Sequence, residues 1–536
     1  MFGQKKKISS RRQQVRNTIA AERTERLSAI ANSPYPAAVG ILFLFILGCV
    51  YLLGLDTTNQ TIVSVFFPTF KPPLELGALA VIVTLICLAA AIYVQHYQPK
   101  IPLRASRCLN LAVLLWLLLA LTRIGSMYPE WVYLATGTSV ICAMILTIVY
   151  DSRFALGISL FYSILACFAV WRIATVELFL TMMAGVTVCC YSLREIRTRM
   201  KLVEVSTLAA VAVFMIAFAM ETIRAMQNIR TMQTNPVTQH MALSPLSGVL
   251  SGLLQAASAA AVTIAVGVAI QAFLPVIERV FKIATSMTLM EYSDANQPLL
   301  KKMAMEAPGT FSHSLLIGSM AETAAETIGA NGLLCRVGAY YHDIGKMNKP
   351  AYFVENQMGS VSRHEQLSPA MSQLVIVGHV KDGMEIALEY GLPAVLRQFI
   401  ESHHGTTLME YFYSEARKKQ DEKLFAVSEA EFRYPGPKPH TKEAAIVMLA
   451  DACESACRSI SELTPTRIEA LVHNIVIKRL QDGQFDECDL TLKELSCIEM
   501  ALAKSLAAHH HGRIPYPKQS ESETPSGHST SPAIAQ

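Results

Sequence analysis

Residues 246–275 read LSGVLSGLLQAASAAAVTIAVGVAIQAFLP, an uncharged run that is long enough to cross the hydrocarbon core of a bilayer. From Val276 onward the chain returns to the mixed polar and apolar composition of a water-soluble protein. The whole chain of 536 residues is 52% hydrophobic and only 16% charged, and its mean hydropathy is +0.34. This composition excludes intrinsic disorder and a coiled coil as the overall class. We therefore predict an integral membrane protein with a soluble C-terminal domain.

Seven more apolar runs precede this one, and each is predicted to form a transmembrane helix within a membrane domain over residues 37–275. The eight predicted spans are Ala37–Leu55, Leu76–Gln95, Cys108–Gly125, Glu130–Tyr150, Ser152–Trp171, Val176–Leu193, Val205–Met220 and Leu246–Pro275. Lys and Arg are concentrated in the basic tail, residues 1–36, and in alternate connections, which predicts that both termini are cytoplasmic. No Asp, Glu, Lys or Arg lies at the centre of a predicted span, which argues against a transporter of charged substrates.

Charge and cysteine content argue against two further classes of protein. The net charge of +4 is spread over 46 basic and 42 acidic residues, and this balance does not predict binding to a nucleic acid polymer. The 12 cysteines are scattered, and those of the soluble part show no CxxC spacing. We therefore predict buried thiols rather than a disulfide or zinc framework.

The soluble part is predicted to be all-α, because its apolar residues recur at helical spacing and are interrupted by Gly and Pro. We expect a helical connector over 276–307, a helical domain over 308–508 and a disordered tail rich in Ser, Pro and Thr over 509–536. Within the domain, Thr310 is predicted to cap a helix over Phe311–Ile328, which Gly329 ends. Gly345 is predicted to end the helix that precedes it.

Histidine and aspartate residues supply the chemistry of the soluble part. The candidates are His313, His342, Asp343, His379, His403, His404 and Asp451. Imidazole nitrogen and carboxylate oxygen suit divalent metals such as Mn, Fe, Ni or Zn. A carboxylate next to a histidine can bridge two such ions. For His364, His440 and His473 we prefer an ordinary structural role.

The order of these residues resembles the H…HD…D pattern of the HD phosphohydrolase superfamily and its two-metal branch. Longer stretches resemble the bacterial seven-transmembrane HD family, whose members hydrolyse cyclic di-AMP. The matching motifs span about Leu289–Ser459, and the membrane part is similar only in its arrangement of spans. These motifs include EAPGT (306–310), HDIGK (342–346), ENQ (355–357), HHGT (403–406) and FRYPGPKP (432–439).

The resemblance implies two Mn or Fe ions and a set of site residues. One ion would be held by His313, His342, Asp343 and Asp451, and the other by Asp343 as a bridge with His379, His403 and His404. The implied catalytic residues are Asp343 and Lys346, and the implied substrate-binding residues are Lys346, Arg433, Tyr411 and Lys438. The implied activity is a phosphodiesterase in the bacterial inner membrane that opens cyclic di-AMP to linear 5′-pApA.

Two departures from the family pattern leave alternatives open. Only Asp56–Glu75 stands where the family carries a large extracytoplasmic domain, and the stretch 362–365 reads SRHE where the family often has NPHD. A hydrolase of cyclic di-GMP or hyperphosphorylated guanosine is one alternative, and a non-enzymatic membrane receptor or transporter with a degenerate HD domain is another. Arg433 and Lys438 lie around a Pro-Gly-Pro sequence that could equally be a structural turn. The oligomeric state also stays open, with a homodimer as one candidate.

Overall fold

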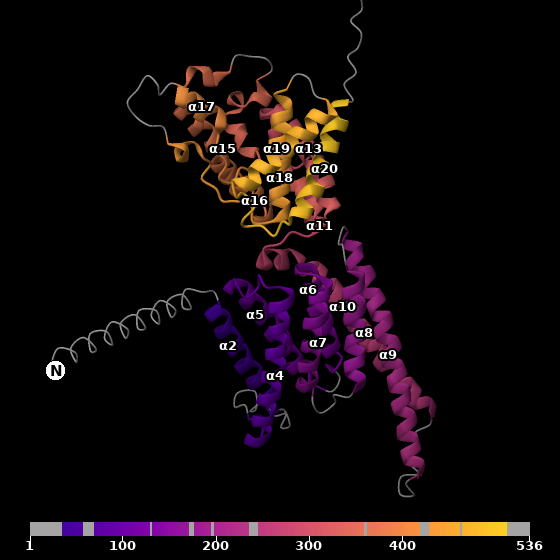
Figure 1. The fold of residues 1–536 in the computed structure, drawn as a ribbon. Coiled ribbons are helices and arrows are strands. Elements are labelled where there is room, and N and C mark those ends of the chain that lie inside the picture. The colour runs from indigo at the N-terminus through magenta and orange to yellow at the C-terminus, as the bar shows by residue number, and fades with distance from the viewer. Residues whose placement is uncertain are drawn as a thin grey trace, which may run out of the picture. The chain divides into compact units, whose positions relative to one another are not determined.

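The computed structural model describes residues 35–56, 69–128, 131–170, 176–193, 198–234, 245–357, 362–418, 428–460 and 464–511 (Figure 1). The predicted basic tail up to residue 34 and the predicted tail beyond His511 lie outside these ranges. The chain divides into two compact units between Glu291 and Tyr292, with Pro393–Val395 grouped with the first unit.

Each of the eight predicted spans forms a helix in the first unit. These helices are α2 (Tyr35–Gly54), α4 (Pro73–Tyr97), α5 (Ala105–Gly125), α6 (Leu134–Val149), α7 (Ser152–Ala169), α8 (Val176–Ser192), α9 (Arg199–Thr234) and α10 (Pro245–Phe281). Six of them are long and apolar enough to cross a membrane, whereas α6 and α8 are apolar helices of 16 and 17 residues. Eight crossings therefore remain a prediction. Helix α10 continues through Pro275, so the predicted connector begins inside a helix.

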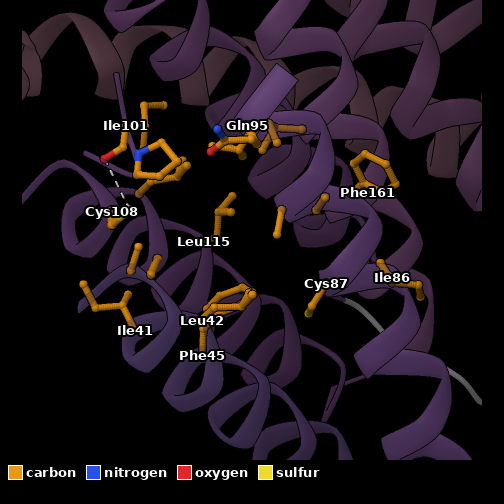
Figure 2. Close-up of a pocket in the computed structure, with 18 of the residues that line it drawn as sticks. Ile41, Leu42, Phe45, Ile86, Cys87, Gln95, Ile101, Cys108, Leu115 and Phe161 are labelled. Atoms are coloured by element: carbon orange, nitrogen blue, oxygen red, sulfur yellow. Dashed lines mark hydrogen bonds between the residues drawn. The ribbon is translucent and has the colours of Figure 1, made fainter. Parts of the chain in front are cut away.

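Several polar side chains inside the first unit bond to one another or to backbone carbonyls, which suits a structure that spans a bilayer. The Thr122 hydroxyl lies 2.6 Å from that of Thr138 and 2.9 Å from that of Tyr162, which links α5, α6 and α7. The Arg123 guanidinium donates to the carbonyls of Ala169 and Leu55. Beside this network, α2, α4, α5 and α7 enclose an apolar cavity of about 250 Å³ (Figure 2).

The second unit is a helical domain, and the all-α prediction is confirmed. After α11 (Ser286–Ser293), its helices are α12 (Pro298–Glu306), α13 (Pro308–Thr327), α14 (Gly332–Tyr341), α15 (Pro369–Glu389), α16 (Ala394–Ser402), α17 (Glu410–Lys418), α18 (Lys442–Arg458), α19 (Pro465–Gln481) and α20 (Leu492–His511). Helix α18 passes through the core, and every side chain from Ala444 to Asp451 is buried. The described residues contain two isolated β-bridges but no strand. All 12 cysteines are free thiols, and eight of them are buried.

Three local predictions are corrected by the helix boundaries. Helix α13 begins at Pro308, so Thr310 lies inside it, and its hydroxyl donates to Glu355 at 3.2 Å instead of capping the helix. Helix α14 ends at Tyr341, before Gly345, which lies in the 3₁₀ turn η3 (Ile344–Asn348). Helix α20 extends to His511, past the predicted start of the disordered tail.

Helices α14 and α16 approach each other closely, and this contact positions the predicted site residues that follow them. These are His342-Asp343 after α14 and His403-His404 after α16. Gly338 on α14 faces the ring of Phe399 on α16, and a Cβ added to Gly338 would lie 2.5 Å from that ring. Phe399 is fully buried in the core. His342 follows Gly338 by one turn, and His403 follows Phe399 by one turn. This glycine–phenylalanine contact therefore sets the distance between the two histidines.

Replacing Gly338 with Ala should force α14 and α16 apart. Overpacking of a filled core costs about 1–3 kcal/mol, so we expect a lower free energy of unfolding in a denaturant titration of the purified protein. Gly378→Ala on α15 is the matched control, because a Cβ there meets nothing within 4 Å. It should be neutral or stabilising, since Ala has the higher helix propensity. Equal losses in the two variants would contradict the role assigned to the Gly338–Phe399 contact.

Candidate metal centre

All seven predicted ligand residues converge on one point of the helical domain, although they come from three helices and from the segments that follow two other helices. His313 lies on α13, His379 on α15 and Asp451 on α18. His342 and Asp343 follow α14 directly, and the pair His403-His404 follows α16. Six of the seven are buried, and His404 is half-buried.

The Asp343 carboxylate stands between two groups of histidines. Its Oδ2 lies 3.1 Å from His342 Nε2 and 3.7 Å from His313 Nε2. Its Oδ1 lies 3.4 Å from His379 Nε2 and 3.5 Å from His403 Nε2. Each oxygen therefore faces a different pair of imidazoles, which is the arrangement that a carboxylate bridging two ions needs.

Asp451 and His404 complete the two groups. Asp451 Oδ1 lies 3.2 Å from His313 Nε2, and Asp451 Oδ2 lies 3.9 Å from His404 Nδ1. The His404 ring stacks on Tyr434, with 4.2 Å between the ring centroids. The ligand atoms of each group lie within 4.8 Å of one another, and the groups share Asp343. The first group is His313, His342, Asp343 and Asp451, and the second is Asp343, His379, His403 and His404.

Backbone carbonyls fix the orientation of three of the rings. His342 Nδ1 donates to the carbonyl of Ala339 at 2.6 Å, and His403 Nδ1 donates to that of Ile400 at 3.0 Å. His379 Nδ1 donates to the carbonyl of Ile376. When Nδ1 carries the hydrogen, Nε2 presents its lone pair to the centre of the cluster, as in a metal-ligating histidine.

The donor set fits divalent cations. His342 Nε2 is buried 3.1 Å from Asp343 Oδ2 but has no well-directed hydrogen bond to any described residue, and a cation bound by both atoms would satisfy them. Burial disfavours the charged form of His342, but the adjacent Asp343 carboxylate outweighs burial and raises the pKa of this imidazole to about 10. Burial also opposes ionisation of Asp343, yet His342 and Lys346 hold its pKa well below the usual range. The cluster therefore attracts positive charge, and it is compatible with a divalent metal site.

Lys346 lies against the shared carboxylate. Its Nζ is 2.6 Å from Asp343 Oδ2 and 2.8 Å from Glu355 Oε1. Gly345, just before it, allows η3 to pack directly on α15, because a Cβ there would lie 1.9 Å from the carbonyl oxygen of His379. This glycine is needed for a close backbone approach.

Sequence reasoning missed two carboxylates that hold the site residues in place. Glu454 Oε2 lies 2.7 Å from His313 Nδ1, and the same carboxylate accepts a hydrogen bond from Arg458. Glu454 follows Asp451 by three residues on α18, so the helical spacing could have indicated it. Glu355, which pairs with Lys346, lies in a short 3₁₀ turn and offers no periodic signal; it begins the ENQ motif, but that motif by itself indicates no partner for it.

A cavity of about 730 Å³ opens onto the cluster, within the range of small-molecule sites. His379, His404 and Lys346 line it, so a ligand there would reach both the histidines and the lysine ammonium. Its other walls are rich in aromatic side chains. These are Tyr352, Phe353, Tyr411, Phe412 and Tyr434. The predicted substrate-binding residue Tyr411 is thus part of the cavity.

Arg433 and Lys438 are not brought to this cavity. The Arg433 guanidinium forms two hydrogen bonds to Asp482, at 2.9 and 3.0 Å, and also contacts Glu429 at 2.7 Å. Lys438 Nζ lies 3.3 Å from Asp486. Since their charges already have carboxylate partners, the structure favours the turn alternative for both residues.

The three histidines that were assigned structural roles lie in ordinary contacts. His440 and His473 pair with the nearby carboxylates of Glu487 and Glu499, at 3.0 and 2.9 Å. His364 Nε2 donates to the carbonyl of Tyr352 at 2.9 Å, and its ring contributes to the wall of the cavity.

Comparison with known protein families finds one matching family model in each of the two units. Residues 73–285 match the model of the 7TM receptor with intracellular HD hydrolase, and residues 310–456 match the HD domain. Over 273 residues the chain is 46% identical to "Cyclic-di-AMP phosphodiesterase PgpH" of Bacillus subtilis, and this match covers 51% of the chain and 36% of the relative. The protein of the same name from Listeria monocytogenes is 44% identical over 244 residues, which covers 46% of the chain and 33% of the relative.

One of the similar solved structures is the crystal structure of the Listeria monocytogenes PgpH HD domain in complex with cyclic-di-AMP. It is 45% identical, covers 40% of this chain and 99% of that domain, and superposes with a TM-score of 0.39. The matched regions amount to about a third of the length of the curated relatives. The receptor model matches the predicted membrane domain, and the HD model matches the predicted helical domain that follows it. The chain thus combines, in this order, a region similar to the 7TM receptor with intracellular HD hydrolase and a region similar to the HD domain.

Proposed function

We propose that this protein is a membrane-anchored phosphodiesterase that opens cyclic di-AMP to linear 5′-pApA and so lowers the level of this second messenger. The observation that carries the proposal is the convergence of seven histidine and aspartate residues on the shared Asp343 carboxylate. The relatives named cyclic-di-AMP phosphodiesterases support the choice of substrate. The reaction adds one water across a P–O3′ bond, which frees a 3′-hydroxyl and leaves a 5′-phosphate.

Two divalent ions, Mn²⁺ or Fe²⁺, would occupy the two groups of ligands. His313, His342 and Asp451 would hold one ion, and the residues His379, His403 and His404 would hold the other, with Asp343 common to both. Bound there, such ions neutralise the charge of a phosphodiester and lower the pKa of water. The ligand set is mixed nitrogen and oxygen, which suits these ions.

The chain's own side chains would orient the substrate. Lys346 lines the cavity next to Asp343, so its ammonium can meet a phosphate oxygen or assist the leaving 3′-oxygen. Glu355 holds this ammonium in place at 2.8 Å. The exposed ring of Tyr411 offers a face for a purine, and such stacking is worth about 1–3 kcal/mol per base.

We further propose that the protein lies in the bacterial inner membrane with both termini and the helical domain in the cytoplasm. The charge bias of the tail and the connections supports this orientation. A homodimer stays a prediction, since the structure is of one chain.

The shared role of Asp343 predicts an asymmetry in metal content. Asp343→Ala should remove both ions and abolish turnover, whereas His404→Ala should remove mainly the second ion. Loss of a ligand or of its orientation costs about 10- to 100-fold in affinity or activity, and loss of the bridge should cost more. Metal per chain is measured by elemental analysis after dialysis of the purified protein against metal-free buffer.

His473→Ala serves as the control for these two variants, because His473 is an exposed histidine paired with Glu499 away from the cluster. It should keep the metal content of the parent chain. Two tightly bound ions per chain in Asp343→Ala would show that the bridging assignment is wrong.

The substrate proposal predicts a preference for adenine. Stacking alone accepts any base, so the preference has to come from hydrogen bonds to the base edge. The purified full-length chain, loaded with Mn²⁺ in detergent, should convert cyclic di-AMP to 5′-pApA with a clearly higher kcat/KM than cyclic di-GMP. Equal or faster turnover of cyclic di-GMP would contradict the substrate while leaving the two-metal phosphodiesterase chemistry intact.

The topology proposal predicts that reporters fused at Arg26 and at Ala508 both read as cytoplasmic. A 16-residue helix such as α6 rises about 24 Å, which is short of a hydrocarbon core of about 30 Å. A periplasmic reading at Ala508 alone would therefore show that one of the two shorter helices, α6 or α8, does not cross.

A further inference from the structure

A second cavity, of about 370 Å³, also opens onto the cluster. It shares His404, Tyr434 and Ser455 with the larger cavity, and it adds Asp451 and the Arg479 side chain. The two cavities therefore meet beside the same imidazole, that of His404. A ligand with two similar halves could place one half in each cavity while its centre lies against the cluster.

Arg479, on α19, differs from the other arginines around the site. Its guanidinium makes no hydrogen bond or ion pair with any residue that the structure describes, and its Nε is buried. Arg458 is bound by Glu454, and Arg433 is bound by Asp482. A cation that is partly withdrawn from water without a partner is unfavourable, so this half-buried side chain is suited to receive an anion.

The acidic groups around Arg479 already have other partners. Glu410 pairs with Lys478 and Asp482 with Arg433, while Asp451 faces His313. Burial lowers the pKa of Arg479, and these carboxylates only partly oppose that effect from beyond ion-pair distance. Arg479 lines the cavity together with Met448 and Ile475, which contribute apolar surface.

We propose that Arg479 binds the phosphodiester of the cyclic dinucleotide that is not being cleaved, and that the second cavity receives this half of the substrate. The inference rests on the proposed function. A cyclic dinucleotide contains two phosphodiesters in one ring, so seating one at the cluster brings the other close by. A guanidinium offers paired N–H donors that match two phosphate oxygens, which an ammonium cannot do.

A comparison of two substrates tests this role in the full-length, Mn²⁺-loaded chain. Cyclic di-AMP carries two phosphodiesters, whereas bis(p-nitrophenyl) phosphate carries only one and has none to present to Arg479. Arg479→Gln should raise the KM for cyclic di-AMP about tenfold or more, because hydrogen bonds to charged groups are strong. Its kcat/KM for bis(p-nitrophenyl) phosphate should stay within about twofold of the parent, which also shows that the variant is folded.

Two further variants sharpen the comparison. Arg479→Lys keeps the charge but loses the paired donors, so its KM for cyclic di-AMP should lie between those of the parent and Arg479→Gln. Arg336→Gln removes an arginine of the same domain that pairs with Glu322 at 3.0 Å, and it should leave the ratio of the two activities unchanged.

The outcomes separate the subsite from the proposed function. A selective rise in the KM for cyclic di-AMP supports the subsite. A parent chain that hydrolyses cyclic di-AMP, with an Arg479→Gln variant that is unchanged or equally impaired on both substrates, overturns the subsite and leaves the function standing. A parent chain that hydrolyses bis(p-nitrophenyl) phosphate but not cyclic di-AMP overturns the proposed function and the subsite with it.

Discussion

The buried carboxylate of Asp343 is the group on which the arrangement of the helical domain depends. A carboxylate that is only 1% exposed is strongly unfavourable unless positive charge surrounds it. Its two oxygens face two pairs of imidazoles, and Lys346 approaches one of them at 2.6 Å. The same demand for positive charge makes the cluster compatible with a divalent metal site.

Close helix packing holds the ligands in this geometry. The Gly338–Phe399 contact fixes α14 against α16, and Gly345 lets η3 rest directly on the backbone of α15. Asp451 lies on α18, which is packed on all sides by the core. Four of the five histidines are also held by a contact at Nδ1, which is how a site acquires a defined spacing.

The arginines around the site show that residue type alone does not define a role. Arg433 lies in the motif that suggested phosphate binding, yet Asp482 and Glu429 already neutralise it. Arg479 lies outside every quoted motif, and its guanidinium has no such partner among the described residues. A cation that is already paired is poorly placed to recognise a second anion, whereas one that is unpaired and partly buried gains by doing so.

The sequence by itself determined the membrane helices, the all-α class and the seven residues of the cluster. These features are local or ordered along the chain: apolar length, helical spacing and motifs that follow one another. Only the tertiary structure decided which Asp343 oxygen faces which histidines, that Glu454 supports His313, and that Arg433 is paired. Asp482 is 49 residues from Arg433 and Glu454 is 141 from His313. Contacts at such separations depend on how helices pack, and no periodicity within the chain encodes them.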